Sequence, residues 1–300
     1  MGYRYKYKND PKLIDAVKGV DPDKVADLLK GKGLRPGLNA DRTGDGGETA
    51  LHVAAERGLT KIVATLISGG ASVDMPDDEG RTPLMRAVLK DEPEGVAAML
   101  AGGANPDAPD KKGVTPLIRA AEADAGGMVA ALLAGNAAID GADADGRTAL
   151  MAAAKKGHAL LVGKLSGAGA SCTARDNKGN TPLHYAAQRP ENDVTLQFLA
   201  GKADLINTAN DAGETPIIVA VKLHNTENAQ ALVDLGADAR IADKSGMNVF
   251  DHARASKRVK FRQAMTEMLE GQVAKREMQK GADNKVSVMK PLRLKKPGPV

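Results

Sequence analysis

The sequence of 300 residues predicts an all-α fold, a solenoid in which helix–turn–helix units stack side by side. Three observations lead to this prediction. A nine-residue motif recurs every 33 residues, apolar residues follow it at the spacing of two short helices, and glycine-rich segments separate the units. Because the period holds over seven copies, we expect one continuous array rather than two globular domains.

The motif is clearest at Gly179, where it reads Gly-Asn-Thr-Pro-Leu-His-Tyr-Ala-Ala. Its glycine fits a tight turn with positive φ, the threonine is a helix N-cap, and proline is favoured as the first helical residue. The leucine and the alanine pair then form the buried stripe of a first helix. The leading glycines are Gly47, Gly80, Gly113, Gly146, Gly179, Gly213 and Gly246.

A second apolar stretch follows each motif, as with Ile62, Val63 and Leu66 after the first copy. It ends at glycines such as Gly69 and Gly70, which can terminate a helix in the left-handed conformation. A single pair of such short helices cannot enclose its own apolar face. We therefore expect the pairs to pack on their neighbours and to form an elongated array with an extended concave face.

The period and the residue pattern of the motif resemble those of the ankyrin repeat, which consists of a β-turn and two helices. The resemblance covers roughly residues 10 to 270. It implies an ankyrin-type α-solenoid whose helix–turn–helix repeats are joined by β-turn loops. It also implies a non-enzymatic module that binds other proteins, as an adaptor, a scaffold or an assembly subunit, and it specifies no partner.

The N-terminal part divides into two segments. Residues 1–9 form a basic arm in which three tyrosines alternate with cations. Three interpretations stay open for this arm: an ordinary terminus, a segment that docks on a partner, or a segment that stacks on RNA or single-stranded DNA. Residues 10–46 are expected to be an N-terminal capping helix pair and loop, because Asp10-Pro11 and Asp21-Pro22 each supply an N-cap and a first-turn proline.

Six repeats are expected in residues 47–245, of which the fifth has one extra residue near Leu205. A connecting loop can accommodate this residue. Residues 246–280 have lost the Thr-Pro-Leu signature, and one side of their second helix is charged, as the outer face of a C-terminal capping repeat requires. Residues 281–300 are rich in Pro, Lys and Gly and predict an extended basic tail.

The net charge of +4 is the sum of basic ends and an acidic middle part of the chain. Cations exceed acids by 3 in residues 1–8 and by 9 in residues 253–300, so residues 9–252 carry a net charge of −8. We expect an acidic solenoid whose two basic ends contact an acidic protein surface or an RNA-containing assembly. The candidate contact residues in these ends are Tyr3, Arg4, Tyr5, Lys6, Tyr7, Lys8, Arg293, Lys295 and Lys296.

The single cysteine, Cys172, excludes an internal disulfide framework and favours a reducing compartment, which we expect to be the cytoplasm. Cys172 takes the place that Val73 and Ile139 hold in other copies, so a buried thiol is expected rather than a reactive one. The sequence has no apolar run of membrane-spanning length, and no signal-peptide stretch is evident at its start.

Residues that catalysis and metal binding commonly use are present, but they do not form a recognisable set. His52 and His184 follow their threonine caps by one helical turn, where other copies carry Met or Ile, so we expect structural histidines. His224 and His252 have no Cys or His at zinc spacing, and neither a calcium loop nor a phosphate-binding loop is complete. We therefore expect no enzymatic activity, cofactor, metal or small-molecule substrate.

Two sets of variable positions are expected to line the concave face, namely the turn tips and the place after the His, Met or Ile of each first helix. Arg and Tyr at that place are residue types common at binding hot spots. A solvated surface charge is the simpler interpretation of any single one. The predicted partner-binding residues are Arg81, Arg86, Lys111, Lys112, Arg119, Arg147, Lys155, Lys156, Lys178, Tyr185 and Arg189.

Two functional hypotheses from different classes follow. The first is a protein–protein interaction module that binds its partner on the concave face, with secondary contacts from the basic tails. The second is an RNA- or nucleoprotein-associated subunit bound through its basic termini, which a steep salt dependence of binding would reveal. A secreted effector is a third hypothesis, which nothing in the sequence tests.

Overall fold

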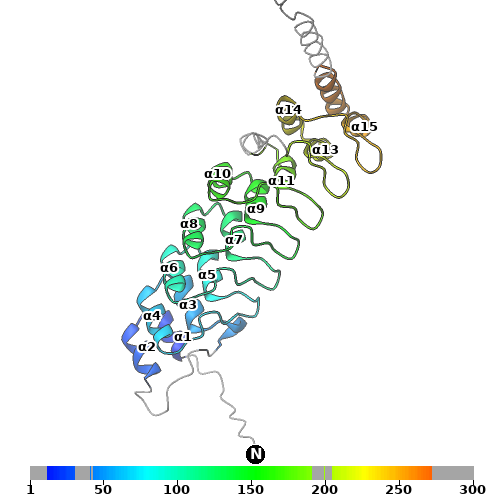
Figure 1. Cartoon of the computed structure of the whole chain (residues 1–300). Coiled ribbons are helices and arrows are strands. Elements are labelled where there is room, and N and C mark those ends of the chain that lie inside the picture. The colour runs from blue at the N-terminus through cyan, green and yellow to red at the C-terminus, as the bar shows by residue number, and fades with distance from the viewer. Residues whose placement is uncertain (1–11, 31–40, 42, 191–198, 200–204, 272–300) are drawn as a thin grey trace, which may run out of the picture.

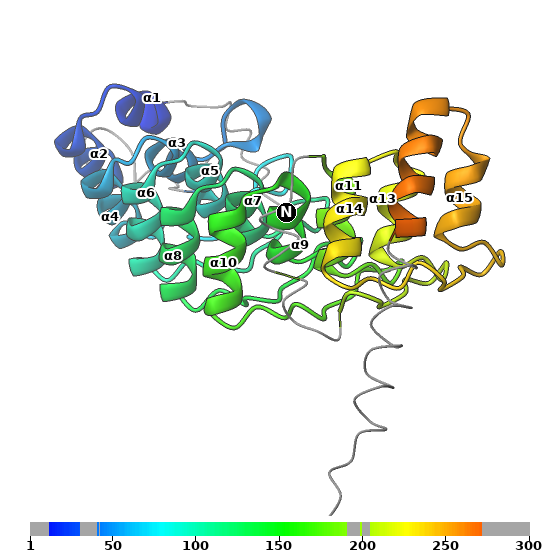
Figure 2. The ribbon, with the colours of Figure 1, turned by 90° about the horizontal axis from the view of Figure 1, so that it is seen from above.

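The structure is a computed structural model that describes residues 12–30, 41, 43–190, 199 and 205–271. Within these residues the regular structure is helical, and extended pairing is limited to two isolated bridges, Thr43 with Thr49 and Ala142 with Thr148. Inner and outer helices form two rows, and loops project from the inner row on the side away from the outer row (Figure 1). The array is elongated, with α1 at one end and α15 at the other (Figure 2). The predicted all-α solenoid is confirmed.

The first helix pair is present, and its second helix begins at the predicted Asp21-Pro22 signal. The pair consists of α1 (Lys12–Lys18) and α2 (Pro22–Leu29), which bury Ile14, Val17 and Val25. Asp21 caps α2, because its carboxylate accepts the backbone N–H of Lys24 at 2.9 Å. The part of this segment around Asp10-Pro11, like residues 31–40, lies outside the described residues.

The inner helices begin directly after the motif threonine, or after Asn248 in the last copy. The hydroxyl groups of Thr49, Thr82, Thr115 and Thr148 accept the backbone N–H three residues further on, at 3.3–3.4 Å, which confirms the predicted caps. The inner helices are α3 (Ala50–Glu56), α5 (Pro83–Leu89), α7 (Pro116–Glu122), α9 (Ala149–Lys156), α11 (Pro182–Gln188), α13 (Pro216–Lys222) and α15 (Val249–Ala255).

The outer helices run antiparallel to the inner ones and end at glycines or at residues next to them, as Gly70 with its φ of 89° shows. A further helix follows α15 from residue 259 to the end of the described part at 271. The second helix expected in the fifth repeat falls largely on residues that are not described. The outer helices are α4 (Thr60–Ser68), α6 (Pro93–Ala101), α8 (Gly126–Ala134), α10 (Ala159–Gly167) and α14 (Thr226–Asp234).

The core is a continuous apolar layer between and within the two rows. The motif leucines Leu51, Leu84, Leu117 and Leu150 are at most 1% exposed, and the alanine pairs allow neighbouring inner helices to approach closely. One approach between rows requires glycine, because a Cβ on Gly95 would lie 2.1 Å from a backbone carbonyl oxygen. Stacking, rather than any single pair, therefore encloses the apolar surface.

Cys172 is buried, with 6% of its surface exposed, and its Sγ lies 3.4 Å from the hydroxyl of Ser166. The expected core-facing thiol is confirmed. Among the described residues, no helix combines the length and the apolar character that a membrane crossing requires.

Candidate functional site

The loops that project from the inner row are tight turns, which we call fingers and number with the repeat whose inner helix follows them. In the finger of repeat two, the N–H of Gly80 donates to the carbonyl of Asp77 at 2.9 Å, and Gly80 has a φ of 78°. The carboxylate Oδ1 of Asp77 accepts the N–H of Glu79 and of Arg81, at 2.8 and 2.9 Å. The fingers comprise residues 77–81, 110–114, 143–147, 176–180, 210–214 and 243–247.

Successive fingers, except those of repeats three and four, are joined at their tips by backbone hydrogen bonds. The N–H of Lys111 donates to the carbonyl of Glu79 at 3.0 Å, and the N–H of Asp211 donates to that of Lys178 at 3.0 Å. The fingers and the inner helices together form one surface, which we call the inner face (Figure 1). This surface corresponds to the predicted concave face.

Each finger starts with Asp, or with Asn210 in repeat six. In four repeats the carboxylate Oδ2 of this Asp accepts a hydrogen bond from the side chain nine residues further on. We call this contact the clasp. The clasp pairs are Arg86 with Asp77, Arg119 with Asp110, Tyr185 with Asp176, and His252 with Asp243, at 2.7–2.9 Å.

The electrostatics of the clasps favour a fixed geometry. Burial alone would raise the pKa of Asp77, but the donors of Arg81, Glu79 and Arg86 hold that pKa below its ordinary value. Burial, and then the Asp176 carboxylate, raise the pKa of Tyr185, so its hydroxyl stays protonated as the donor. The clasps therefore act as charge-assisted hydrogen bonds that tie each finger to its inner helix.

Two repeats lack a clasp because the residue at the donor position cannot donate. In repeat four this residue is Ala152, and Asp143 is bound instead by Arg147 of its own finger, at 2.8 Å to Nε and 2.7 Å to Nη2. In repeat six it is Val219, and Asn210 bonds within its finger and to Asn180. The inner face is hollowed at both places, by about 170 Å³ and 640 Å³ respectively.

The predicted partner-binding residues fall into two groups in the structure. Four arginines are partly buried and already form ion pairs with carboxylates of the chain, and Tyr185 is 7% exposed with its hydroxyl bonded. Those arginines are Arg81, Arg86, Arg119 and Arg147. The exposed members are Lys111, Lys112, Lys155, Lys156, Lys178 and Arg189. Arg147, Lys155, Lys156 and Tyr185 come together around the hollow at repeat four.

The predicted tail contacts, residues 3–8 and 293–296, lie outside the described residues. The clasps were not foreseen from the sequence. The signal for them was an Asp three residues before five of the six glycines from Gly80 to Gly246, with Asn in the remaining copy.

The two motif histidines link neighbouring repeats. Nδ1 of His52 accepts the N–H of Thr49 at 3.0 Å, so Nε2 carries the proton and donates to the carbonyl of Arg81 at 2.9 Å. His184 makes the same pair of contacts, with Thr181 and with the carbonyl of Glu214. Both side chains are buried, and the predicted structural role is confirmed.

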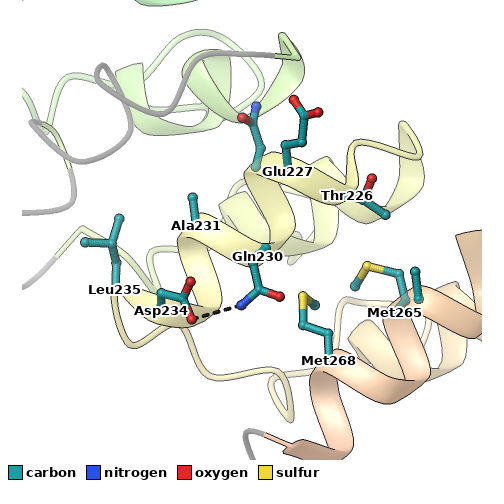
Figure 3. A pocket seen from close by; sticks show the side chains of 10 residues that line it. Thr226, Glu227, Gln230, Ala231, Asp234, Leu235, Met265 and Met268 are labelled. Atoms are coloured by element: carbon teal, nitrogen blue, oxygen red, sulfur yellow. Dashed lines mark hydrogen bonds between the residues drawn. The ribbon is translucent and has the colours of Figure 1, made fainter.

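A third hollow, of about 870 Å³, lies on the outer side of the array between α14 and the final helix. Gln230 and Asp234 of α14 face Met265 and Met268 of the final helix across it, and Gln230 bonds Asp234 at 2.9 Å (Figure 3). The described part of the chain holds no group of three or more His, Cys, Asp or Glu side chains that could hold a metal ion.

The stacked pairs, their fingers and the inner face define a repeat solenoid with a hollowed inner face. The sequence matches the family described as Ankyrin repeats (3 copies) over residues 13–110, 92–176 and 157–243, so the chain belongs to the ankyrin repeat family. Ankyrin repeats are in general protein–protein interaction modules, and members of the family are typically non-catalytic.

Solved ankyrin structures share the fold. The human ASB11 ankyrin repeat domain is 22% identical, with a TM-score of 0.63, and the match covers 74% of this chain and 98% of that domain. The ankyrin repeat domain of Bcl-3, described as a unique member of the IkappaB protein family, is 26% identical, with a TM-score of 0.65, over 75% of this chain and 100% of that one. No curated protein sequence matches the chain.

Proposed function

We propose that this protein is a non-enzymatic interaction module that binds a protein partner on its inner face. The observation that carries the proposal is the division of charge on that face. The aspartates that begin the fingers of repeats two, four and five are buried and accept backbone hydrogen bonds, whereas Asp145 and Asp211 at finger tips are exposed. The lysines at the finger tips and helix ends are exposed and have no ion-pair partner among the described residues, namely Lys111, Lys112, Lys155, Lys156 and Lys178.

This arrangement supports binding for a physical reason. The clasps and the tip-to-tip bonds hold the fingers in place before a partner arrives, so little conformational entropy is lost on association. The remaining cations then supply electrostatic complementarity, which mainly sets specificity and the association rate. The inner face thereby holds the partner in one fixed position along the array.

The basic termini are proposed to make secondary contacts through the tail residues named above. The alternative is a subunit bound to RNA or to a nucleoprotein by these termini, which the excess of cations in residues 1–8 and 253–300 favours. In that case affinity falls steeply with salt and the inner face is dispensable.

Affinity capture with a set of chains distinguishes the two functions. The set comprises the intact chain, a chain without residues 1–8 and 281–300, and an inner-face variant with Lys112→Glu and Lys178→Glu. A matched control carries Lys61→Glu and Lys164→Glu, two charge reversals of exposed lysines on outer helices.

We expect the tailless chain and the outer-face control to retain the same partner, and the inner-face variant to lose most of it. The proposal is wrong if the tailless chain retrieves nothing and nuclease removes everything from the intact chain. It is also wrong if the inner-face and outer-face variants retain the partner equally.

A further inference from the structure

Repeat four departs from the pattern of its neighbours at the donor position of the clasp. Ala152 occupies the place of Arg119 in repeat three and of Tyr185 in repeat five. Because Ala152 has no group that reaches the finger, Asp143 is bound only by Arg147 and by backbone donors of the same finger. The space that a clasp fills in the neighbouring repeats stays open as the hollow of about 170 Å³.

The floor of this hollow is apolar and its rim is cationic. Ile118 and Met151 lie at the floor and are 2% and 0% exposed. Arg147, Lys155 and Lys156 lie at the rim. The hollow thus has an apolar lower part and positively charged side chains at its opening, which suits an aliphatic stem that ends in an anion.

The cations at the rim are available for a ligand. The ammonium of Lys155 lies 5.8 Å from the ring centre of Tyr185, and Lys156 has no ion-pair partner among the described residues. Arg147 uses Nε and Nη2 for Asp143, and its Nη2 also lies 3.6 Å from the carboxylate of the exposed Asp145; its Nη1 has no partner in the described part. The acid in the wall, Glu122, is held by Arg119 at 2.9 Å, so its charge is compensated.

The volume limits what can enter. An apolar cavity of about 150 Å³ holds a single benzene ring, so a hollow of this size takes one side chain and not a folded segment. We propose that the hollow binds a Glu or Asp side chain from an acidic segment of the partner protein. The apolar floor contacts the stem of that side chain, and its carboxylate accepts hydrogen bonds from the rim cations. This inference rests on the proposed function, since it specifies which partner chemistry the inner face selects.

The next hollow along the inner face fits the continuation of such a segment. It is lined by the amide of Gln188, by the exposed Lys178 and Asp211, and by Glu214, which is paired with Lys222. The Gln188 amide can pair with a donor or acceptor of a peptide backbone, whereas the amide nitrogens of Asn177 and Asn180 are bonded within the chain. A nucleic acid fits less well, because Tyr185, the aromatic residue that lines the hollow at repeat four, is only 7% exposed and so offers little ring surface for base stacking.

The test starts from random peptides displayed on phage and selected on the full-length chain. We expect the selected peptides to share a Glu or Asp at one fixed place. A fluorescent copy of the best peptide is then titrated against the chain and three variants. Ala152→Arg fills the hollow with the residue type of repeats two and three, Lys156→Glu reverses a rim charge, and Lys61→Glu is the same change on the outer helix α4.

Ala152→Arg and Lys156→Glu are each expected to weaken binding about tenfold or more, and Lys61→Glu to leave it unchanged. Replacing the shared acid of the peptide by Gln should weaken binding to the parent chain by a similar factor and change little in the Ala152→Arg variant. Lys156 is exposed, so its variant tests the inference without altering the packed interior.

Selected peptides without a shared acid, or an affinity that Ala152→Arg leaves unchanged, would overturn the inference. If those peptides still lose affinity with Lys112→Glu and Lys178→Glu, the inner face binds protein and only the acidic anchor is wrong. If no variant of the inner face matters, the proposed function fails as well. Binding of a short oligouridylate that Ala152→Arg abolishes would also overturn the inference, because the occupant is then a nucleic acid.

Discussion

Repeats three and four share the architecture of their inner helices but differ on the inner face. In repeat three Arg119 bonds Asp110 and closes the surface, whereas in repeat four Ala152 leaves a hollow beside Arg147. Both inner helices begin after a capping threonine, and both bury the motif leucine. The shared caps and buried leucines therefore stabilise the stack. The residue nine places after the aspartate that begins each finger decides the local shape of the inner face.

The largest effect is expected from the positions that the two repeats share. Leu117→Ala and Leu150→Ala each remove a buried side chain and are expected to lower the free energy of unfolding by about 2–5 kcal/mol. Equilibrium unfolding in urea measures the loss of stability in each variant. If the free energy of unfolding of either variant fell by well under about 1 kcal/mol, the common packing of the two repeats would be contradicted.

Removing the clasp of repeat three and introducing one into repeat four should have the next largest effect on the free energy of unfolding. Arg119→Ala leaves the nearly buried Asp110 carboxylate without its side-chain donor and is expected to cost about 1–2 kcal/mol. Ala152→Arg should be neutral or slightly stabilising, because Asp77 already accepts both Arg81 and Arg86 in the same geometry. Unfolding curves of both variants check this, and a large loss for Ala152→Arg would show that the hollow cannot accept an arginine.

A pH dependence should separate the repeats that carry a motif histidine from those that carry Met or Ile. Burial lowers the pKa of His52 and of His184 below the ordinary value of 6.5. The unfolded chain then binds more protons than the folded one, so the stability is full above pH 6.5 and is lost as the pH falls toward the folded pKa values.

The variant His52→Met with His184→Ile, which uses the residue types of the other repeats, should lose less stability than the parent between about pH 7.5 and about pH 5.5. Urea unfolding at the two pH values measures the difference. Equal losses in parent and variant would show that other groups govern the acid sensitivity.

The smallest effect is expected at Cys172. The thiol is 6% exposed, and Val73 holds the equivalent place, so Cys172→Val should change the free energy of unfolding by less than about 1 kcal/mol. In the folded parent chain the thiol should react with a thiol-specific reagent only as fast as the protein opens. Rapid labelling under native conditions would contradict the burial.

The elements of the fold were predictable because their signals are local. A threonine cap, the proline after it and a glycine with positive φ act within a few residues, and the period of 33 repeats them. The same reasoning predicted the roles of His52 and Cys172, which the structure confirms.

The site was less predictable because its contacts join residues that a turn brings together. The finger aspartates recur and were visible, but their partner nine residues on is Arg, Ala, Tyr, Val or His, so no constant pair marks the clasp. Arg86 and Arg119 looked like free cations in the sequence, and the structure finds them bound to Asp77 and Asp110. The hollow at Ala152 follows from the absence of such a pair.

Hydrogen exchange of the full chain with and without its captured partner tests the central claim most directly. The account predicts slower exchange in the fingers of repeats three to six and at the C-terminal ends of α7, α9 and α11, with no change in α4, α6, α8 and α10. Protection confined to the outer helices, or to the terminal segments 1–9 and 281–300, would contradict it.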